Sequence, residues 1–252
     1  MKVKEYIAEK LSSEGAMLFS LIDPLDYSDM EHIVATAKNA YEGGTDIVLI
    51  GGSIGVQGPF LDAVVKNIKE VVSVPVVLFP GNIATLTPYA DATYFMSLLN
   101  SRNTYWITRA QMLAAPVVKK LDMETLSIAY LVGEPGGSVG FVGEVDLLPR
   151  ENVKIAAAYA MAAELMGFDY VLTDAGSNPK EHLPLDFISA VRKATNLPYI
   201  VAGGIKTPDQ AANVIRAGAD CIQVGTAFEL ENGLDKFKAF VASVKGEGKK
   251  RI

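Results

Sequence analysis

The stretch that decides the fold is LPYIVAGGIKTPDQAANVIRAGADCIQVGT, residues 197–226. It begins and ends with short, continuous apolar runs, which are typical of strands buried on both faces of a parallel sheet. Between these runs, Thr207 followed by Pro208 predicts the start of a helix, and Gly218 predicts its end. The stretch therefore predicts a strand–helix–strand unit with a glycine-rich turn after each strand.

The same unit recurs along the whole chain, because eight short apolar runs alternate with helical patterns. This alternation predicts an α/β protein, a single (β/α)8 barrel of the TIM type over residues 1–252, which is close to the about 250 residues that this fold needs. A doubly wound open sheet is the alternative. The apolar runs are residues 16–22, 46–52, 74–81, 92–99, 126–132, 169–173, 197–204 and 220–226.

The composition excludes several classes of protein. Half of the 252 residues are apolar, which supports a large buried core and excludes a disordered chain. The 23 Lys and Arg against 29 Asp and Glu give a net charge of −6, so we expect no nucleic-acid partner. A lone cysteine, Cys221, and a charged N-terminal stretch without the apolar run of a signal peptide indicate a cytoplasmic protein. No apolar run reaches the about 18 residues of a transmembrane segment.

Two long segments stand out between the predicted strands. Residues 98–125 are long for a connection plus a helix, and residues 133–149 form a glycine-rich stretch without periodicity, which we expect to be a loop. In a barrel both segments leave the carboxyl ends of strands, where active sites lie. Tyr105 and Trp106 in the first segment are compatible with covering an apolar channel, with an oligomer interface or with ordinary packing.

The glycines after the last two strands predict a phosphate site. Paired glycines let backbone N–H groups approach an anion, and in barrels of this type the loops after strands seven and eight frequently bind phosphate. Tight turns alone would also explain the glycines. The end of the sixth strand, TDAGSN, adds hydroxyls, a carboxylate and another glycine. The predicted substrate-binding residues are Thr173, Asp174, Ala175, Gly176, Ser177, Asn178, Gly203, Gly204, Gly225 and Thr226.

A second set of polar residues ends the first two strands. Asp23 follows the first strand and Ser53 the second, so their side chains are expected at the same end of the barrel. A carboxylate and a hydroxyl are hard oxygen ligands that suit Mg²⁺. Asp23 is equally compatible with a role in a turn. The nearby Asp26 and Asp29 are expected to cap the following helix.

Read in order, these segments resemble the geranylgeranylglyceryl phosphate synthase family, which includes the bacterial heptaprenylglyceryl phosphate synthases. The resemblance covers nearly the whole chain, and FMSLLNS and EPGGSVG are its most distinctive motifs. It implies transfer of a prenyl (geranylgeranyl) group from the prenyl diphosphate to the C3 hydroxyl of sn-glycerol 1-phosphate, in ether-lipid biosynthesis. Matching stretches include LIDP (21–24), LIGGS (49–53), FMSLLNS (95–101), EPGGSVGFVGE (134–144), AGGIKTPDQA (202–211) and AGADCIQVGTA (217–227).

The resemblance also implies roles for individual residues. Asp23 and Ser53 match the Mg²⁺ positions that hold the diphosphate, and the glycines after strands seven and eight match the glycerol-phosphate site. The sixth-strand motif of the family reads Tyr-Leu-Glu-Ala-Gly-Ser, but here the first three residues are Leu172, Thr173 and Asp174. Leu172 offers no hydroxyl, and strand alternation points Thr173 to the other face. Asp174 keeps a carboxylate and is the candidate catalytic base.

The resemblance further implies an apolar trough for the prenyl chain and a homo-oligomer, since the family forms dimers and hexamers. Tyr94 and Phe95 are candidates for the trough. We expect contact with a membrane surface only at product release. One alternative is a phosphosugar isomerase or aldolase, which would need a Lys or a Glu/His pair at strand ends that we do not find. Another is a non-catalytic phosphometabolite-binding protein, against which the Asp23 and Ser53 pair argues.

Overall fold

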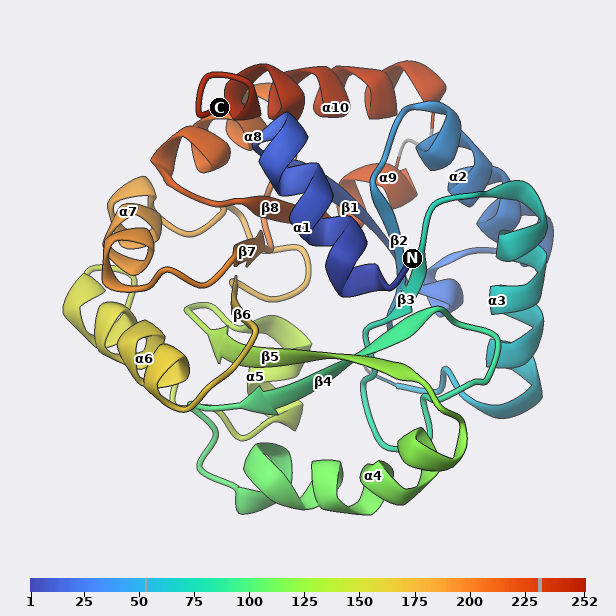
Figure 1. Cartoon of the computed structure of the whole chain (residues 1–252), viewed down its shortest axis with the longest axis horizontal. Helices are drawn as coiled ribbons and strands as arrows, with labels where there is room; N and C mark the ends of the chain where they lie inside the picture. The colour runs from blue at the N-terminus through green and yellow to red at the C-terminus, as the bar shows by residue number, and fades with distance from the viewer. Residues whose placement is uncertain (53, 231–232) are drawn as a thin grey trace.

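The parallel strands of the computed structural model close into a barrel in chain order, with β8 pairing with β1 (Figure 1). The structure describes residues 1–52, 54–230 and 233–252. Each predicted apolar run overlaps one strand, so the (β/α)8 barrel is confirmed and the open sheet is excluded. The strands are β1 (Met17–Ile22), β2 (Ile47–Ile50), β3 (Val76–Leu78), β4 (Ala92–Leu98), β5 (Glu124–Val132), β6 (Tyr170–Asp174), β7 (Tyr199–Ala202) and β8 (Cys221–Val224).

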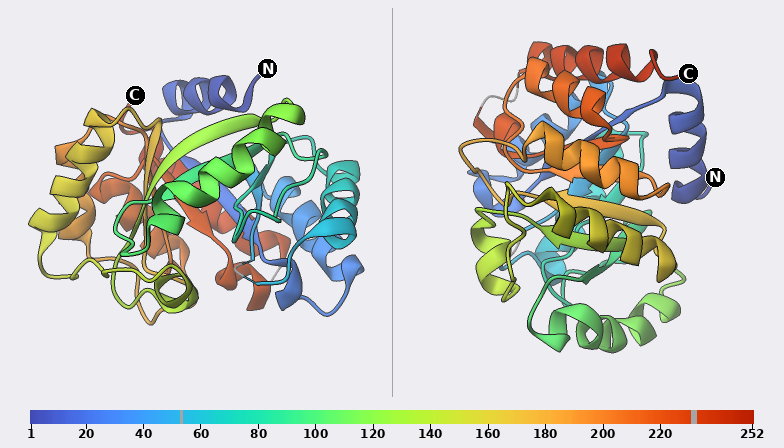
Figure 2. Two further views of the ribbon diagram at one scale, coloured as in Figure 1. Left: turned by 90° about the horizontal axis from the view of Figure 1, so that it is seen from below. Right: turned by 90° about the vertical axis from the view of Figure 1, so that its left-hand side faces the viewer.

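Helices form an outer layer around the barrel (Figures 1 and 2). Thr207 caps α8 as predicted, because its hydroxyl accepts a hydrogen bond from the Gln210 N–H at 3.2 Å. No helix in the described ranges is long and apolar enough to cross a membrane. The helices are α1 (Val3–Glu14), α2 (Met30–Glu42), α3 (Gly58–Val71), α4 (Ala110–Lys120), α5 (Gly137–Val142), α6 (Val153–Leu165), α7 (Leu185–Ala194), α8 (Pro208–Ala217), α9 (Thr226–Leu230) and α10 (Leu234–Gly248), with the short 3-10 helix η1 (Pro24–Asp26) and the π-helix η2 (Tyr105–Arg109).

Alternation along each strand separates two apolar layers. In β6, Val171 belongs to the layer between the barrel and its helices, whereas Leu172 belongs to the cluster inside the barrel. Leu131 and Tyr130 of β5 divide in the same way. Because both faces of the strands are buried, the sequence reads as continuous apolar runs rather than an alternating pattern.

The amino-terminal helix α1 was not predicted. It lies across one end of the barrel (Figures 1 and 2), and its Val3 and Ile7 join the interior cluster. The Glu124 carboxylate, at the start of β5, accepts hydrogen bonds from the backbone N–H groups of Val3 at 2.6 Å and Lys4 at 3.0 Å. Since α1 covers the amino-terminal end of the barrel, ligand access is expected at the opposite end.

The two long segments lie together beyond the carboxyl ends of β4 and β5. Residues 98–125 contain η2 and α4, while residues 133–149, predicted as a loop, contain the short helix α5. That prediction was wrong because six residues with two glycines are too short and too glycine-rich to show helical periodicity. The Ser101 hydroxyl donates to the Gly143 carbonyl at 2.6 Å, and Asn103 donates to the Glu144 carboxylate at 2.6 Å. The segments therefore hold each other in place.

Candidate active site

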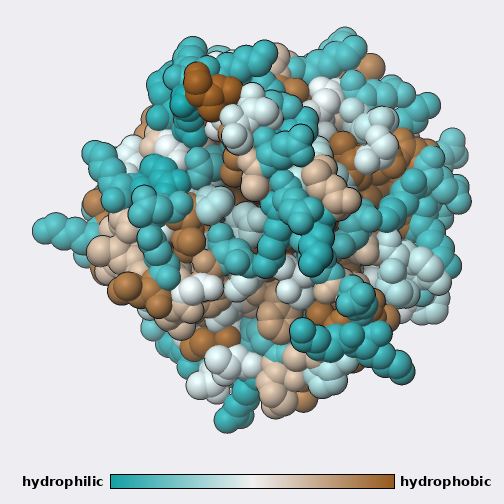
Figure 3. All heavy atoms as spheres, viewed as in Figure 1, coloured by the Kyte–Doolittle hydropathy of each residue, from teal (hydrophilic) through white to brown (hydrophobic). Residues whose placement is uncertain are grey.

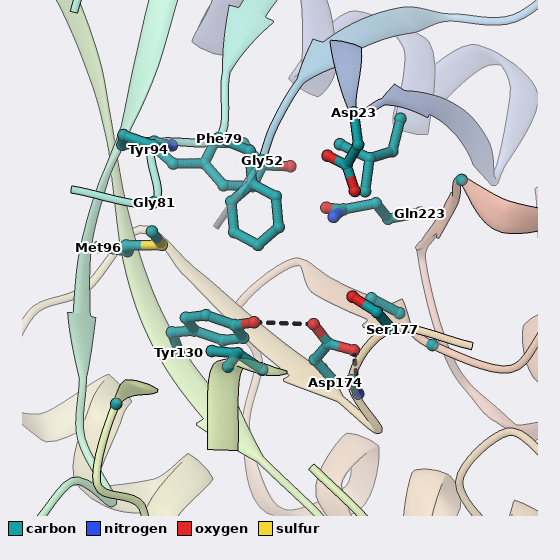
Figure 4. Close-up of a pocket in the computed structure, with 18 of the residues that line it drawn as sticks. Asp23, Gly52, Phe79, Gly81, Tyr94, Met96, Tyr130, Asp174, Ser177 and Gln223 are labelled. Carbon is teal, nitrogen blue, oxygen red and sulfur yellow. Dashed lines mark hydrogen bonds between the residues drawn. The ribbon is translucent and has the colours of Figure 1, made fainter. Parts of the chain in front are cut away.

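A cavity of about 300 Å³ opens among the carboxyl ends of the strands, on the face opposite α1. One side is polar and is formed by residues that follow β1, β6, β7 and β8. The other side is apolar and is formed by residues that follow β3 and by residues of β4, η2 and α4. Figure 4 shows Asp23 and Gln223 facing Asp174 and Tyr130 across this space. The cavity therefore combines a polar pocket with an apolar arm.

The most constrained side chain in the polar pocket is Asp174, which is 6% exposed at the end of β6. Its Oδ2 accepts a hydrogen bond from the Tyr130 hydroxyl at 2.7 Å, and its Oδ1 accepts one from the Gly176 N–H at 2.7 Å. Burial raises the pKa of the Asp174 carboxyl, and the two hydrogen bonds partly oppose that rise. A carboxylate held at both oxygens and made more basic by burial is suited to accept a proton.

Tyr130 is a site residue that sequence reasoning missed. It is the register partner of Leu172 on the adjacent strand, and its buried hydroxyl reaches Asp174 (Figure 4). The β5 strand thus contributes a hydroxyl to the pocket beside Asp174. Tyr130 lies two residues before the end of β5, where strand alternation points its side chain into the barrel. This position is the sequence signal that could have identified Tyr130.

The glycine turns bring the backbone against the same pocket. Gly203 and Gly204 have φ of +84° and +74°, and both line the cavity. A Cβ on Gly203 would lie 2.7 Å from the Asp174 Oδ1, so the backbone passes directly beside the carboxylate. The structure thus brings together most of the predicted substrate residues, which line one cavity: Asp174, Gly176, Ser177, Asn178, Gly203, Gly204, Gly225 and Thr226.

Two predicted residues, Thr173 and Ala175, are placed differently, and a third is not described. The Thr173 hydroxyl hydrogen-bonds to the Tyr199 hydroxyl at 2.7 Å, on the outer face of β6. Its side chain is not brought to the cavity, because strand alternation turns it toward the helices. The Ala175 side chain also lies in the outer layer. Ser53 lies outside the described residues.

Asp23 follows β1 at the other side of the polar pocket. Its Oδ1 is buried and has no hydrogen-bond partner among the residues that the structure describes. Burial, with the added charges of Asp26 and Asp174, raises the pKa of the Asp23 carboxyl to about 6. Asp26 lies in η1 and is exposed, whereas Asp29 accepts a hydrogen bond from the His32 N–H at 2.9 Å and caps α2 as predicted. A carboxylate oxygen that accepts no hydrogen bond is a suitable ligand for a hard cation.

Comparison with known proteins identifies the family. The chain matches the PcrB family over residues 13–244. The chain belongs to the PcrB family. It is 49% identical to the geranylgeranylglyceryl phosphate synthase of Methanosphaera stadtmanae, over 91% of this chain and 93% of that protein. It is 44% identical to the enzyme of the same name from Thermococcus kodakarensis, over 97% and 98%. The resemblance found in the sequence is confirmed.

A solved structure of the same kind matches this PcrB family member along its length. The geranylgeranylglyceryl phosphate synthase from Thermoplasma acidophilum, in complex with its substrate sn-glycerol-1-phosphate, superposes with a TM-score of 0.93 at 35% identity. The match covers 98% of this chain and 99% of the other. The two proteins therefore share the barrel from end to end.

The apolar arm of this PcrB family member runs from the barrel interior to α4. Phe79 packs edge-on against Tyr94 and Tyr130, with ring centroids 5.4 and 5.7 Å apart. Trp106 of η2 lines the same arm, and Gln111 donates to the Met96 and Trp106 carbonyls at 2.5 and 3.1 Å. Further lining residues come from α4 and β4, namely Phe95, Ala110, Ala114 and Val118. Tyr94 and Phe95, the predicted trough residues, both line this arm.

Proposed function

We propose that this protein is a geranylgeranylglyceryl phosphate synthase, which joins the prenyl group of geranylgeranyl diphosphate to the C3 hydroxyl of sn-glycerol 1-phosphate and releases diphosphate. The observation that carries this proposal is one cavity that joins a glycine-lined polar pocket containing Asp174 to an extended apolar arm. A small phosphate substrate alone would leave the apolar arm unused. The names of the relatives and the Thermoplasma complex support the same reaction.

The chain's own residues supply positioning and a base. The turns at Gly203–Gly204 and Gly225–Thr226 hold the phosphate of the acceptor through backbone groups, with Ser177 beside them. The acceptor's C3 hydroxyl then faces Asp174, whose carboxylate removes the proton as the hydroxyl oxygen attacks the first carbon of the prenyl group. The bonds from Tyr130 and Gly176 keep that carboxylate in one orientation. The acceptor is thereby aligned with the prenyl carbon.

The diphosphate end is assigned to the β1 side of the cavity. The orphaned Asp23 Oδ1 fits a hard cation, and Asp23 with Ser53 would hold Mg²⁺ there. Bound Mg²⁺ supplies Lewis-acid stabilisation of the negative charge that grows on the leaving diphosphate. The prenyl chain would extend along Phe79, Tyr94 and Trp106, away from water.

The mouth of the cavity supports a peripheral membrane contact in a cytoplasmic enzyme. Large apolar side chains on three of the connections that leave the carboxyl ends of the strands are exposed, with Leu25 of η1 at 56%, Ile54 at 72% and Phe141 of α5 at 88%. Substrate and product both carry a long hydrocarbon chain, which partitions into lipid. These side chains would seat the mouth against the lipid surface while the product leaves.

The direct test incubates the protein with labelled sn-glycerol 1-phosphate, Mg²⁺ and prenyl diphosphates of increasing length. We expect a labelled prenylglyceryl phosphate and released diphosphate, with the highest rate for the chain that fills the apolar arm. Omitting Mg²⁺ should abolish the product. If glycerol phosphate binds but no prenyl diphosphate yields product, the enzyme proposal is overturned in favour of a binding protein.

A further inference from the structure

Three carboxylates converge beside the β1 end of the cavity. Asp23, Asp26 and Glu229 each place one oxygen within 4.8 Å of the others. They come from two parts of the chain, since Asp23 follows β1 and Asp26 ends the adjoining η1, whereas Glu229 lies in α9. The cluster thus concentrates negative charge beside the cavity.

A buried amide independently points to a ligand at this place. Gln223, on β8, is 3% exposed, and its Oε1 has no hydrogen-bond partner in the described part of the chain. Figure 4 shows its amide end directed at the Asp23 carboxylate. A buried carbonyl oxygen without a partner is costly in a folded protein, and each such group needs an explanation. A cation bound beside Asp23 would be a partner for this oxygen.

The backbone around the carboxylates leaves them room. A Cβ on Gly51 would lie 2.4 Å from the Asp23 Oδ1, and one on Gly225 would lie 3.4 Å from the Glu229 Oε1. A side chain at position 51 would therefore overlap the Asp23 oxygen, whereas one at position 225 would make an ordinary van der Waals contact with Glu229. The turn after β2 keeps the space beside Asp23 open.

The cluster also conflicts with the charge of the proposed substrates. Both are anions, and three carboxylates at the edge of their cavity would repel them. A divalent cation bound among the carboxylates reverses the local sign of the charge and attracts a diphosphate. The cluster therefore favours binding of the substrates only when a cation occupies it.

We propose that Glu229, Asp26 and the Gln223 amide oxygen join Asp23 in binding a divalent cation, so that α9 and β8 contribute to a site so far assigned to the ends of β1 and β2. The donors are all oxygens, which selects a hard cation of the Mg²⁺ or Mn²⁺ class over Zn²⁺ or Cu²⁺. The use of this cation in prenyl transfer rests on the proposed function, but its binding does not.

Binding of Mn²⁺ alone, followed by the electron paramagnetic resonance signal of the free ion, tests the proposal without any substrate. The matched variants are Glu229→Gln, which keeps the shape and removes the charge, and Glu42→Gln, which makes the same change at an exposed carboxylate on α2. We expect Glu229→Gln to weaken Mn²⁺ binding at least about tenfold, because a charged ligand is lost. Glu42→Gln should bind like the wild type.

A third variant tests the buried amide. Gln223→Met retains the length of the side chain and removes the amide oxygen, so we expect weaker Mn²⁺ binding with unchanged circular dichroism.

Wild-type Mn²⁺ affinity in Glu229→Gln, or no Mn²⁺ binding by the wild type, would overturn the inference. If prenyl transfer fails while Mn²⁺ binding still depends on Glu229, the proposed function falls and the cation site stands. If prenyl transfer proceeds but Glu229→Gln binds Mn²⁺ normally, the proposed function stands and the cation site falls.

Discussion

The carboxylate of Asp174 is the single group on which the proposed chemistry depends. Asp174→Asn keeps both hydrogen bonds available, since the amide can accept from the Gly176 N–H and donate to the Tyr130 oxygen. We expect kcat to fall about 10²–10⁴-fold with little change in either KM, which is the usual contribution of a general base. Steady-state kinetics measure this. Thr173→Val, on the outer face of the same strand, is the control. Near wild-type kcat in Asp174→Asn would assign proton removal to water or to the departing diphosphate.

The Tyr130 hydroxyl sets the pH range in which Asp174 is ionised. Its hydrogen bond lowers the pKa of that carboxyl against the larger, opposing effect of burial. A base works when deprotonated, so activity rises as the pH passes upward through its pKa. Tyr130→Phe removes the bond, raises the pKa further, and is expected to move the acidic limb of the kcat/KM profile to higher pH.

The control for Tyr130→Phe is Tyr199→Phe. The Tyr199 hydroxyl is also buried and shares a hydrogen bond of 2.7 Å with the Thr173 hydroxyl. Thr173, however, faces away from the cavity. Both variants lose a buried hydrogen bond, and both should lose similar stability. Only Tyr130→Phe should shift the pH profile; an equal shift in Tyr199→Phe would show that the effect is structural.

A site residue can be predicted from the sequence when the pattern that identifies it lies in its own segment of the chain. Asp174, Gly203 and Gly204 each follow a strand directly, and the structure places all of them around the cavity. Tyr130 could not be placed in the same way, because its role depends on the register of β5 against β6. Glu229 was missed for a similar reason, since its proximity to Asp23 arises only when the barrel closes.

Among the elements, the turn between β7 and α8 is the most sensitive to substitution. Gly204 has φ of +74°, and a Cβ there would lie 2.5 Å from the Glu181 carbonyl carbon. Gly204→Ala is expected to cost about 1–2 kcal/mol for the left-handed backbone alone. Moving the turn should also raise the KM for glycerol phosphate more than the KM for prenyl diphosphate.

Thermal unfolding and substrate kinetics together check this prediction. Gly246→Ala is the control, because a Cβ on this α10 residue meets nothing within 4 Å and the helix favours alanine by about 1 kcal/mol. That variant should be as stable as the wild type or more so. A selective rise in the KM for prenyl diphosphate in Gly204→Ala would show that the two substrate sites have been exchanged.

The predictability of each element follows from its burial. All strands were predicted because both faces of each are buried, which gives runs of apolar residues that no loop shares. The helix α1 was missed because few of its residues face the barrel, so its sequence is mostly polar. The π-helix η2 was missed because its bonding follows from contacts such as Ser97 donating to the Ile107 carbonyl at 2.7 Å, across ten residues.

At the scale of the whole molecule, the surface indicates a second copy of the chain. The helix α6 buries Ala156, Ala160 and Ala163 against the barrel, yet its opposite face is also apolar. There Met161 is 47% and Leu165 89% exposed, and Figure 3 shows brown and tan side chains gathered over this helix at the left edge. A helix that is apolar all round is normally buried, so we predict that this face packs against another protomer.

Light scattering coupled to size-exclusion chromatography tests the prediction with Leu165→Glu. The wild type is expected to elute as a homo-oligomer and Leu165→Glu as a smaller species, because a carboxylate would be buried without a partner in the interface. At 89% exposure, this substitution should leave the fold of the protomer intact, within about 0.5 kcal/mol. Met112→Glu places the same charge on α4, where Met112 is 62% exposed, and should leave the mass unchanged. If Met112→Glu elutes as the smaller species and Leu165→Glu keeps the wild-type mass, the interface is formed by α4 and not by α6.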